Sequence, residues 1–269
     1  MCDFIENIKY SPYEKIINRI MCYKICPNPD WVMYNNKKET KELVKNFGDY
    51  TPHMINFMKI YENNLWGKGS GNGSSICFAA HSIIMLKVML ELLGVDILID
   101  LPCGDQQWIY LLRDELPDLK YIGVDIVPGV IQYNIENFSK SGQIEFFLND
   151  LETPEVFNLI KKKSKIWNEN SIVAVLTRHT LEHNTLKVSY DYLNSLKKAP
   201  INFFIGTNQW NVEKNVDIMP GEYTPRNYYM EPYNLPRGIV SWPEHEIDRI
   251  YGSTMLEIWD MKLFPTNLA

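Results

Sequence analysis

Short hydrophobic runs alternate with helical or polar segments over most of the chain. Five near-continuous runs have the length typical of strands that are covered on both faces. They are Ile97–Asp100, Tyr121–Asp125, Ile144–Leu148, Ile172–Leu176 and Ile201–Ile205. A sixth run, Met255–Trp259, alternates with period two and predicts an edge strand. Strands that alternate with helices predict an α/β fold, a doubly wound and mostly parallel sheet.

Three longer segments complete this outline. The most apolar one, Ile76 to Val95, contains His81, Lys87 and Glu91, so it predicts a core-facing helix and not a membrane span. Within residues 1–60, patterns such as Tyr13–Ile20 are typical of short amphipathic helices. Residues 207–243 are rich in Pro, Tyr and Asn and predict a long structured loop, at the strand ends where α/β sheets bind ligands.

Composition narrows the class of protein. The chain has 269 residues, 45% of them hydrophobic and 22% charged, enough for one large domain with a sizeable core. The net charge is −6 and no long basic stretch exists, which argues against a nucleic-acid partner. Five cysteines without a repeated metal-binding spacing predict reduced thiols and no metal. The first ten residues lack the apolar run of a signal peptide, so a cytoplasmic location is expected.

Acidic residues end the predicted strands. The first strand runs into Asp100-Leu101-Pro102-Cys103-Gly104-Asp105, and Asp125 follows Gly104 by 21 positions. That distance is typical of the carboxylate that binds ribose in a nucleotide-binding unit. A dinucleotide site needs several glycines around the pyrophosphate, and here Asp105 would repel it. The same carboxylate would attract the sulfonium and ammonium of S-adenosylmethionine.

Two further strand ends carry polar residues. Asp150 follows the third strand and suits the adenine amino group, although it could instead cap a helix. The fourth strand continues into Thr177-Arg178-His179-Thr180-Leu181-Glu182-His183, an unusually polar end to an apolar run. The two histidines there are candidates for proton transfer.

At this point the chain resembles the class I S-adenosylmethionine-dependent methyltransferases. Its closest similarity is to a bacterial polysaccharide-tailoring branch that includes capsular O-methyl phosphoramidate methyltransferases. The matching segments are Tyr61–Gly67, Asp100–Trp108, Tyr121–Pro128 and Arg178-His179 with His183. The resemblance covers about residues 60–265. It implies a Rossmann-like seven-stranded sheet with an antiparallel edge strand over residues 61–269, preceded by an N-terminal helical extension over residues 1–60.

The resemblance also implies roles for individual residues. Those expected to bind the donor are Trp66, Gly69, Ser70, Ser75, Asp100, Cys103, Gly104, Asp105, Trp108, Asp125, Ile126, Asn149, Asp150, Leu151 and Arg178. The glycine-rich stretch 69–75 would close over the methionine end, or would be a flexible linker. His179 or His183 would be the general base, with Asp217 in reserve, and Arg226 and Asn227 would contact the acceptor.

Two departures from the family pattern are visible. Gln106 replaces the usual second glycine of the first loop, and His179 stands where many relatives have an acid. The leading hypothesis is O-methylation of a small polar acceptor, a sugar hydroxyl or a phosphate or phosphoramidate group, in capsule or surface polysaccharide biosynthesis. A nicotinamide-dependent oxidoreductase and a catalytically inactive, methyltransferase-like partner protein are the alternatives. The oligomeric state cannot be predicted from these features.

Overall fold

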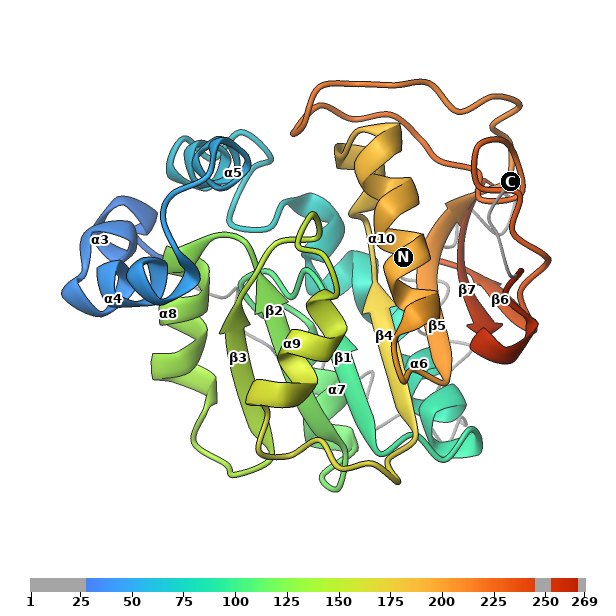
Figure 1. Ribbon diagram of the computed structural model, residues 1–269, viewed down its shortest axis with the longest axis horizontal. Coiled ribbons are helices and arrows are strands. Elements are labelled where there is room, and N and C mark those ends of the chain that lie inside the picture. The colour runs from blue at the N-terminus through green and yellow to red at the C-terminus, as the bar shows by residue number, and fades with distance from the viewer. Residues whose placement is uncertain (1–27, 245–252, 266–269) are drawn as a thin grey trace.

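A seven-stranded sheet forms the centre of the computed structural model, which describes residues 28–244 and 253–265 (Figure 1). The strand order is β3-β2-β1-β4-β5-β7-β6. The first five strands are mutually parallel, and β7 runs antiparallel to both of its neighbours. The strands are β1 Ile97–Asp100, β2 Lys120–Asp125, β3 Ile144–Leu148, β4 Val173–Thr177, β5 Phe203–Gln209, β6 Val240–Pro243 and β7 Thr254–Asp260. The predicted fold class is confirmed.

The antiparallel strand occupies a different place from the one predicted for it. Residues 255–259 lie in β7, which is second from the edge because β6 pairs along its outer side. The edge strand β6 comes from the last residues of the segment predicted to be a loop. Its four residues, Val-Ser-Trp-Pro, are too few and too mixed in polarity to give a strand pattern.

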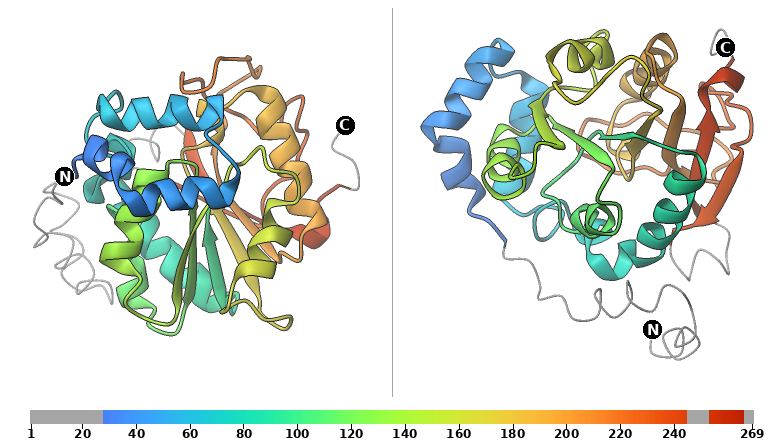
Figure 2. Two further views of the ribbon diagram at one scale, coloured as in Figure 1. Left: turned by 60° about the vertical axis from the view of Figure 1, so that its left-hand side comes forward. Right: turned by 90° about the horizontal axis from the view of Figure 1, so that it is seen from below.

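Helices cover both faces of the sheet (Figure 2). They are α3 Trp31–Asn36, α4 Lys38–Phe47, α5 Pro52–Glu62, α6 Ile76–Leu92, α7 Ile109–Glu115, α8 Pro128–Phe138, α9 Val156–Lys163 and α10 Leu186–Lys198. Helices α6, α7 and α8 pack on one face with Leu98 of β1, while α9 and α10 pack on the other with Ile97 and Ile99. Burial on both faces explains why the parallel strands are almost continuously apolar. Among the described residues, no helix is long and apolar enough to cross a membrane.

The helices before the sheet belong to the same hydrophobic core as α6, α7 and α8. Trp31 of α3 packs edge-on against Tyr61 of α5 and Tyr133 of α8, with ring centroids 5.2 and 5.6 Å apart. Helix α5 begins at Thr51, whose side chain accepts a hydrogen bond from the Met54 N–H. It lies above the carboxyl ends of the strands (Figures 1 and 2). The helix expected over Tyr13–Ile20 lies outside the described residues, and the domain division at residue 60 stays a prediction.

A long connection, residues 210–239, joins β5 to β6, and we call it the strap. It crosses the top of the molecule towards α5 (Figure 1). The Asn56 side-chain amide donates to the Pro220 carbonyl at 2.6 Å, and the Gly221 N–H donates to the His183 carbonyl at 2.8 Å. A side chain at Gly221 would meet Asn56 and Ile60 of α5 at 2.9 Å, and its φ is +92°. Glycine therefore permits the close approach of the strap to α5.

Candidate active site

A cleft of about 800 Å³, measured out to its open mouth, lies at the carboxyl ends of β1 to β4 beneath α5. Parallel α/β sheets bind their ligands at this edge, where the strand order reverses between β1 and β4. The predicted donor residues that line the cleft are Trp66, Ser70, Asp100, Cys103, Gly104, Trp108, Asp125, Ile126, Asn149, Asp150, Leu151 and Arg178. Both candidate bases, His179 and His183, line it as well. The fold thus brings the strand-end residues together, and their roles stay predictions.

Asp125, at the end of β2, is held by backbone N–H groups. Its carboxylate accepts from the Gly104 N–H at 3.0 Å and from the Val127 N–H at 2.9 Å. The side chain is buried and has no ion-pair partner among the residues of known placement. Burial raises the pKa of Asp125 to about 6, although the two N–H donors oppose that rise. The two backbone N–H groups therefore fix the orientation of the Asp125 carboxylate, but no cation in the described part of the chain is paired with its negative charge.

Asp100, at the end of β1, is in a similar position. It accepts a hydrogen bond from the Tyr121 hydroxyl at 2.7 Å and is only 4% exposed. Burial raises its pKa to about 7, against the lowering effect of the Tyr121 hydrogen bond. Two buried carboxylates thus border the cleft without a paired cation, which favours a ligand that carries positive charge.

The glycine-rich stretch closes onto the first loop. Ser70 donates to the Asp105 carboxylate at 2.7 Å and accepts from the Asp105 N–H at 3.0 Å, and Tyr61 lies 2.7 Å from the same hydroxyl. A Cβ at Gly104 would sit 2.3 Å from the Ser70 hydroxyl, and one at Gly69 would sit 1.8 Å from the Asp105 carboxylate. Both glycines have positive φ. The two segments can meet only because these positions lack side chains.

Three of the predicted donor residues lie outside the cleft lining. Gly69 and Asp105 form the contact between the glycine-rich stretch and the first loop, behind the cleft wall. Ser75 precedes α6 at the cap position and makes no side-chain capping bond. Burial raises the pKa of Asp105, with hydrogen bonds from Ser70 and Gln107 opposing it. Gly69 and Asp105 therefore shape the loop, and Ser75 ends the glycine-rich stretch.

Gln106 takes over the backbone geometry that a glycine would supply. Its φ is +63°, a left-handed conformation that few side chains adopt. The side-chain amide donates to the Cys103 carbonyl at 3.1 Å and to the Tyr121 hydroxyl at 2.8 Å. These bonds hold the loop in place despite the backbone cost.

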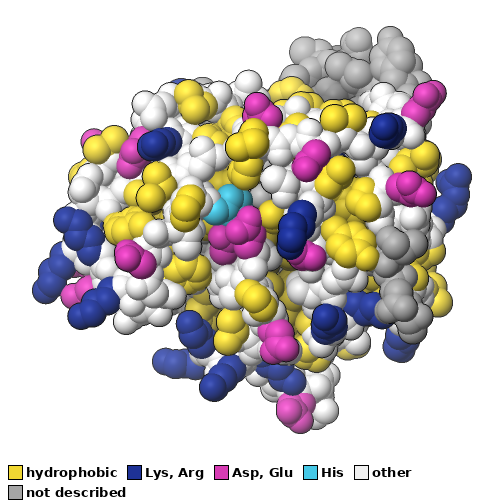
Figure 3. All heavy atoms as spheres, turned by 45° about the horizontal axis from the view of Figure 1, so that its top comes forward, with side chains coloured by type: hydrophobic (Ala, Val, Ile, Leu, Met, Phe, Trp, Pro, Cys, Tyr) yellow, Lys and Arg dark blue, Asp and Glu magenta, His cyan; other side chains and the backbone are white. Residues whose placement is uncertain are grey.

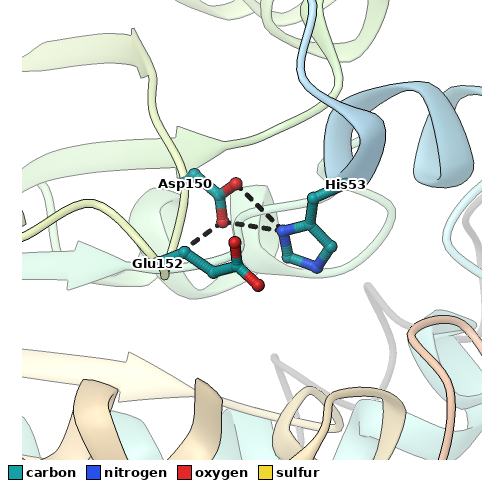
Figure 4. A group of neighbouring side chains, drawn as sticks. All are labelled: His53, Asp150 and Glu152. Carbon is teal, nitrogen blue, oxygen red and sulfur yellow. Dashed lines mark hydrogen bonds and ion pairs between the residues drawn. The ribbon is translucent and has the colours of Figure 1, made fainter. Parts of the chain in front are cut away.

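Asp150 forms an ion pair with a histidine from outside the predicted motifs (Figure 4). His53 Nδ1 lies 2.9 Å from both carboxylate oxygens, and the Glu152 N–H donates to one of them at 3.0 Å. His53 Nε2 lies 3.1 Å from the Asn184 side-chain oxygen. Burial lowers the pKa of His53, but Asp150 outweighs it and the net shift is upward. Asp150 therefore faces the cleft, where an adenine-binding residue is expected, and its carboxylate is at the same time bound to His53 of α5.

His53, Asp150 and Glu152 lie close enough that their ligand atoms fall within 4.8 Å of one another (Figure 4). A divalent cation would need an unprotonated ring nitrogen. Both nitrogens of His53 instead face oxygen acceptors, so each carries hydrogen. His53 itself is therefore the cation of this group.

His179 is enclosed by two carboxylates. Its Nδ1 lies 2.8 Å from Glu182, and its Nε2 lies 3.0 Å from Glu244, which also pairs with Arg178 at 2.8 Å. Burial lowers the pKa of His179, but Glu244 and Glu182 outweigh it and raise that pKa to about 9. Its φ of +50° is strained for a histidine. Because both nitrogens carry hydrogen near neutral pH, His179 has no lone pair with which to accept a proton.

His183 has the opposite character. Its Nδ1 donates to the Glu222 carbonyl of the strap at 2.9 Å, which leaves Nε2 as the unprotonated nitrogen. Burial lowers its pKa below the ordinary value, so the ring is neutral near pH 7. The ring lies against Trp66, with centroids 4.6 Å apart, and against Tyr223 at 5.5 Å. Of the two predicted histidines, only His183 presents a proton acceptor.

The three predicted strap residues do not reach the cleft lining. Arg226 is fully buried, and its guanidinium donates to the backbone carbonyls of Leu181, Val216 and Asn184. Asn227 hydrogen-bonds to Asn215, Trp210 and Val212 within the strap. Asp217 is exposed and accepts from the first N–H of α10. Each has local backbone partners, so the placement differs from that expected for acceptor or base residues.

Several cleft residues were not anticipated from the sequence. These are His53, Phe57, Tyr61, Ser74, Leu101, Pro102, Thr180 and Asn184, with Glu182 and Glu244 directly behind them. Glu182 stands three residues after His179, a spacing that could have indicated the pair. His53 and Glu244 are far from every strand-end motif, and the sequence carries no signal that connects them to it.

Comparison with known proteins agrees with this fold. No family model matches the sequence. A segment of 77 residues is 32% identical to a malonyl-[acyl-carrier protein] O-methyltransferase of Acetivibrio thermocellus, and it spans 27% of each chain. The structure aligns with a candidate methyltransferase from Thermobifida fusca at a TM-score of 0.55 and 12% identity, covering 88% of this chain and 99% of that one. Magnesium protoporphyrin IX methyltransferase from Synechocystis, solved with S-adenosylmethionine, gives 0.44 and 11% over 87% and 98%.

The chain therefore has the class I methyltransferase fold. The strand order 3-2-1-4-5-7-6 with an antiparallel β7 and the alignment to the Thermobifida fusca protein both support this assignment. The segment shared with the Acetivibrio thermocellus enzyme is about a quarter of that relative's length.

Proposed function

We propose that this protein is an S-adenosylmethionine-dependent O-methyltransferase. The observation that carries the proposal is the pair of buried carboxylates, Asp100 and Asp125, that border the cleft without an ion-pair partner among the described residues. A dinucleotide would bring a pyrophosphate to the first loop, where Asp105 is buried as well. A donor with a sulfonium and an ammonium group would instead compensate this charge.

The donor would lie along the ends of β1, β2 and β3. Asp125, whose carboxylate is held by the Gly104 and Val127 N–H groups, would accept hydrogen bonds from the two ribose hydroxyls. Asp150 and Leu151 would frame the adenine, and Gly104 would allow the methionine portion to approach the backbone. Trp66 and Arg178, predicted to bind the donor, also line the cleft, where Trp66 lies against His183 and Arg178 pairs with Glu244. We propose that both lie on the acceptor side instead.

His183 is the proposed general base. S-adenosylmethionine supplies a methyl group on a cationic sulfur, and transfer is a displacement that depends on positioning. An alcohol acceptor must lose its proton as the oxygen–carbon bond forms and the carbon–sulfur bond breaks. His183 Nε2 would take that proton, and the Glu222 carbonyl would keep the ring in the required tautomer.

For the acceptor we propose the class that the sequence resemblance implies, a small polar molecule of capsule or surface polysaccharide biosynthesis. A sugar hydroxyl and a phosphate or phosphoramidate oxygen are the two candidates. Arg226 supports neither, since its guanidinium is bound to backbone carbonyls. Arg178 is paired with Glu244, and this pairing reduces its attraction for an anion and favours the hydroxyl.

A thermal-shift titration tests the donor assignment. S-adenosylhomocysteine should raise the unfolding temperature increasingly with its concentration, since the stabilisation follows RT ln(1 + c/Kd) at free ligand concentration c, and NAD should leave it unchanged. Stabilisation by NAD alone would replace the proposal with a nicotinamide-dependent oxidoreductase. Binding of the donor without turnover on sugar or phosphate acceptors would indicate the inactive partner protein.

A further inference from the structure

An ion pair between α5 and the end of β3 takes no part in the methyl-transfer step. His53 lies in the first turn of α5, Asp150 follows β3, and Asn184 follows the turn η2, Leu181–His183. The His53 side chain contacts both of the others, although it is separated from Asp150 by 97 positions and from Asn184 by 131. All three are buried, and all three line the cleft (Figure 4 shows His53 with Asp150).

The hydrogen bonds around His53 determine its protonation. The Asn184 amide nitrogen donates to the Thr180 carbonyl at 2.9 Å, so the amide oxygen must be the atom that faces His53 Nε2. The Asp150 carboxylate, also an acceptor, faces Nδ1. A neutral imidazole has one N–H and could satisfy only one of these acceptors. His53 is therefore an imidazolium in this arrangement.

The groups around His53 stabilise its positively charged form. Asp150 and Glu152 supply negative charge from the end of β3, and Asn184 supplies a neutral acceptor from beyond η2. On its own helix the neighbour is the Phe57 ring, edge-on at 5.0 Å. Burial disfavours the charge, so the cation persists only while both acceptors stay in place.

We propose that His53 is a positioning residue of the donor site, which as an imidazolium fixes Asp150 and Asn184 and holds α5 closed over the adenine end. This inference rests on the proposed function, because the donor gives the fixed geometry its purpose. Asp150 can accept the adenine amino hydrogens only if its carboxylate points into the cleft, and the contact with His53 sets that direction. Helix α5 also brings Phe57 and Tyr61 to the cleft, so the ion pair positions that wall too.

Loss of the His53 proton should weaken donor binding. Without hydrogen on Nε2, a nitrogen lone pair would face the Asn184 oxygen, and the contact that ties α5 to η2 would become repulsive. The raised pKa places this loss above pH 6.5. Asp125 and Asp100, with pKa values of about 6 and 7, act in the opposite direction, since their ionisation strengthens binding as the pH rises. His179 titrates separately, at about 9.

The experiment measures S-adenosylhomocysteine affinity by calorimetry from pH 5 to pH 9.5. The wild-type protein should show a rising limb through pH 6–7 and then a falling limb at higher pH. In His53→Gln, affinity near pH 6.5 should fall about fivefold and the falling limb should vanish, because glutamine cannot titrate. The matched control is His81→Gln, a histidine of α6 that bonds the Pro243 carbonyl outside the cleft lining. Its profile should equal that of wild type.

A second variant avoids the loss of the buried ring. Asn184→Asp places a carboxylate against Nε2, which should raise the pKa of His53 and move the falling limb to higher pH. A purely structural role for His53 would not produce that displacement. Wild-type affinity and an unchanged falling limb in His53→Gln, or an unmoved limb in Asn184→Asp, would overturn the inference while leaving donor binding intact. Failure of the wild-type protein to bind S-adenosylhomocysteine at any pH would overturn the proposed function, and the inference with it.

Discussion

Buried carboxylates in the two halves of the cleft have pKa values shifted in opposite directions. In the half proposed to bind the donor (the donor half), at the ends of β1 and β2, burial raises the pKa of Asp100 and Asp125 to about 7 and 6. In the half proposed to bind the acceptor (the acceptor half), beyond β4, Glu182 and Glu244 are equally buried, yet His179 and Arg178 hold their pKa values below the ordinary range. The difference is the presence of cations. Glu182 and Glu244 each have a cation within 3.0 Å, whereas Asp100 and Asp125 have none among the described residues. Asp150, the third buried carboxylate at the strand ends of the donor half, is paired with His53.

This contrast indicates where each half obtains its stability. The donor half keeps an electrostatic cost that a cationic ligand would relieve, so ligand binding and folding are coupled there. In the acceptor half, Arg178 and His179 already neutralise the buried carboxylates. In Figure 3, which turns the carboxyl ends of the strands towards the viewer, acidic side chains gather beside a histidine among hydrophobic side chains.

The largest effect is expected at His183. His183→Asn should lower turnover about 10²–10⁴-fold, because the only free proton acceptor of the histidine pair is removed. Donor affinity should stay close to that of wild type. Turnover is measured as S-adenosylhomocysteine release with the acceptor, and His179→Gln is the comparison variant, expected to lose less activity. A His183→Asn rate within threefold of wild type would place the base elsewhere.

Glu244→Gln should remove the negative charge that neutralises Arg178 and His179 in the acceptor half. Arg178 would then be a buried cation without a carboxylate partner, and His179 would keep only Glu182, at a cost of about 3–5 kcal/mol in the free energy of unfolding. Urea denaturation at pH 7 measures this cost. Glu213→Gln, at an exposed strap position, is the control and should change little. Equal stability of the two variants would show that the acceptor half does not depend on these charges.

Asp125→Ala should weaken donor binding. Two ribose hydroxyls would lose a charged acceptor worth about 1.5–3 kcal/mol, so S-adenosylhomocysteine affinity should fall roughly tenfold to a hundredfold. Calorimetry measures the change, and circular dichroism confirms folding. An unchanged affinity would remove Asp125 from the donor site.

The smallest effect is expected at Asp100, and it depends on pH. Its folded pKa of about 7 exceeds the unfolded value near 3.9, so the folded state retains a proton that the unfolded state releases. Stability from this group therefore falls as the pH rises from about 4 to 7. Asp100→Asn, which can still accept from Tyr121, should be more stable than wild type at pH 8 by on the order of 1–2 kcal/mol and equal to it near pH 4. A stability difference that does not vary with pH would contradict the assignment.

The donor half could be predicted from the sequence because its contacts are set by strand ends. Gly104 and Asp125 meet through neighbouring parallel strands, and the spacing of 21 residues records that geometry. The carboxyl ends of β1 to β4 share one edge, so their polar residues had to converge there. Only Gly69, Ser75 and Asp105 lie outside the lining, since proximity in sequence does not tell which side of a loop faces the cavity.

The acceptor half could not be predicted in the same way. Its partners come from residues 207 and 244, and no local pattern links those segments to His179. Arg226 and Asn227 had the side chains of ligands, but the irregular strap contains many carbonyls that need donors. Strand β6 was missed for a related reason, because its pairing with β7 is long-range and its four residues are not patterned.

Strand β7 pairs with β5 on one side and with β6 on the other, so a single strand anchors both ends of the strap. Part of the strap could therefore be replaced while β5 and β6 stay paired to β7. Replacing residues within 210–239 by a segment of another length would change the entropy of loop closure only slowly, since the sheet already holds the ends together. No residue of the strap lines the cleft, but its Glu222 carbonyl orients His183 and its Pro220 carbonyl holds Asn56 of α5. A chimera of this kind would therefore change the support of the proposed base while β1 to β4 stay the same.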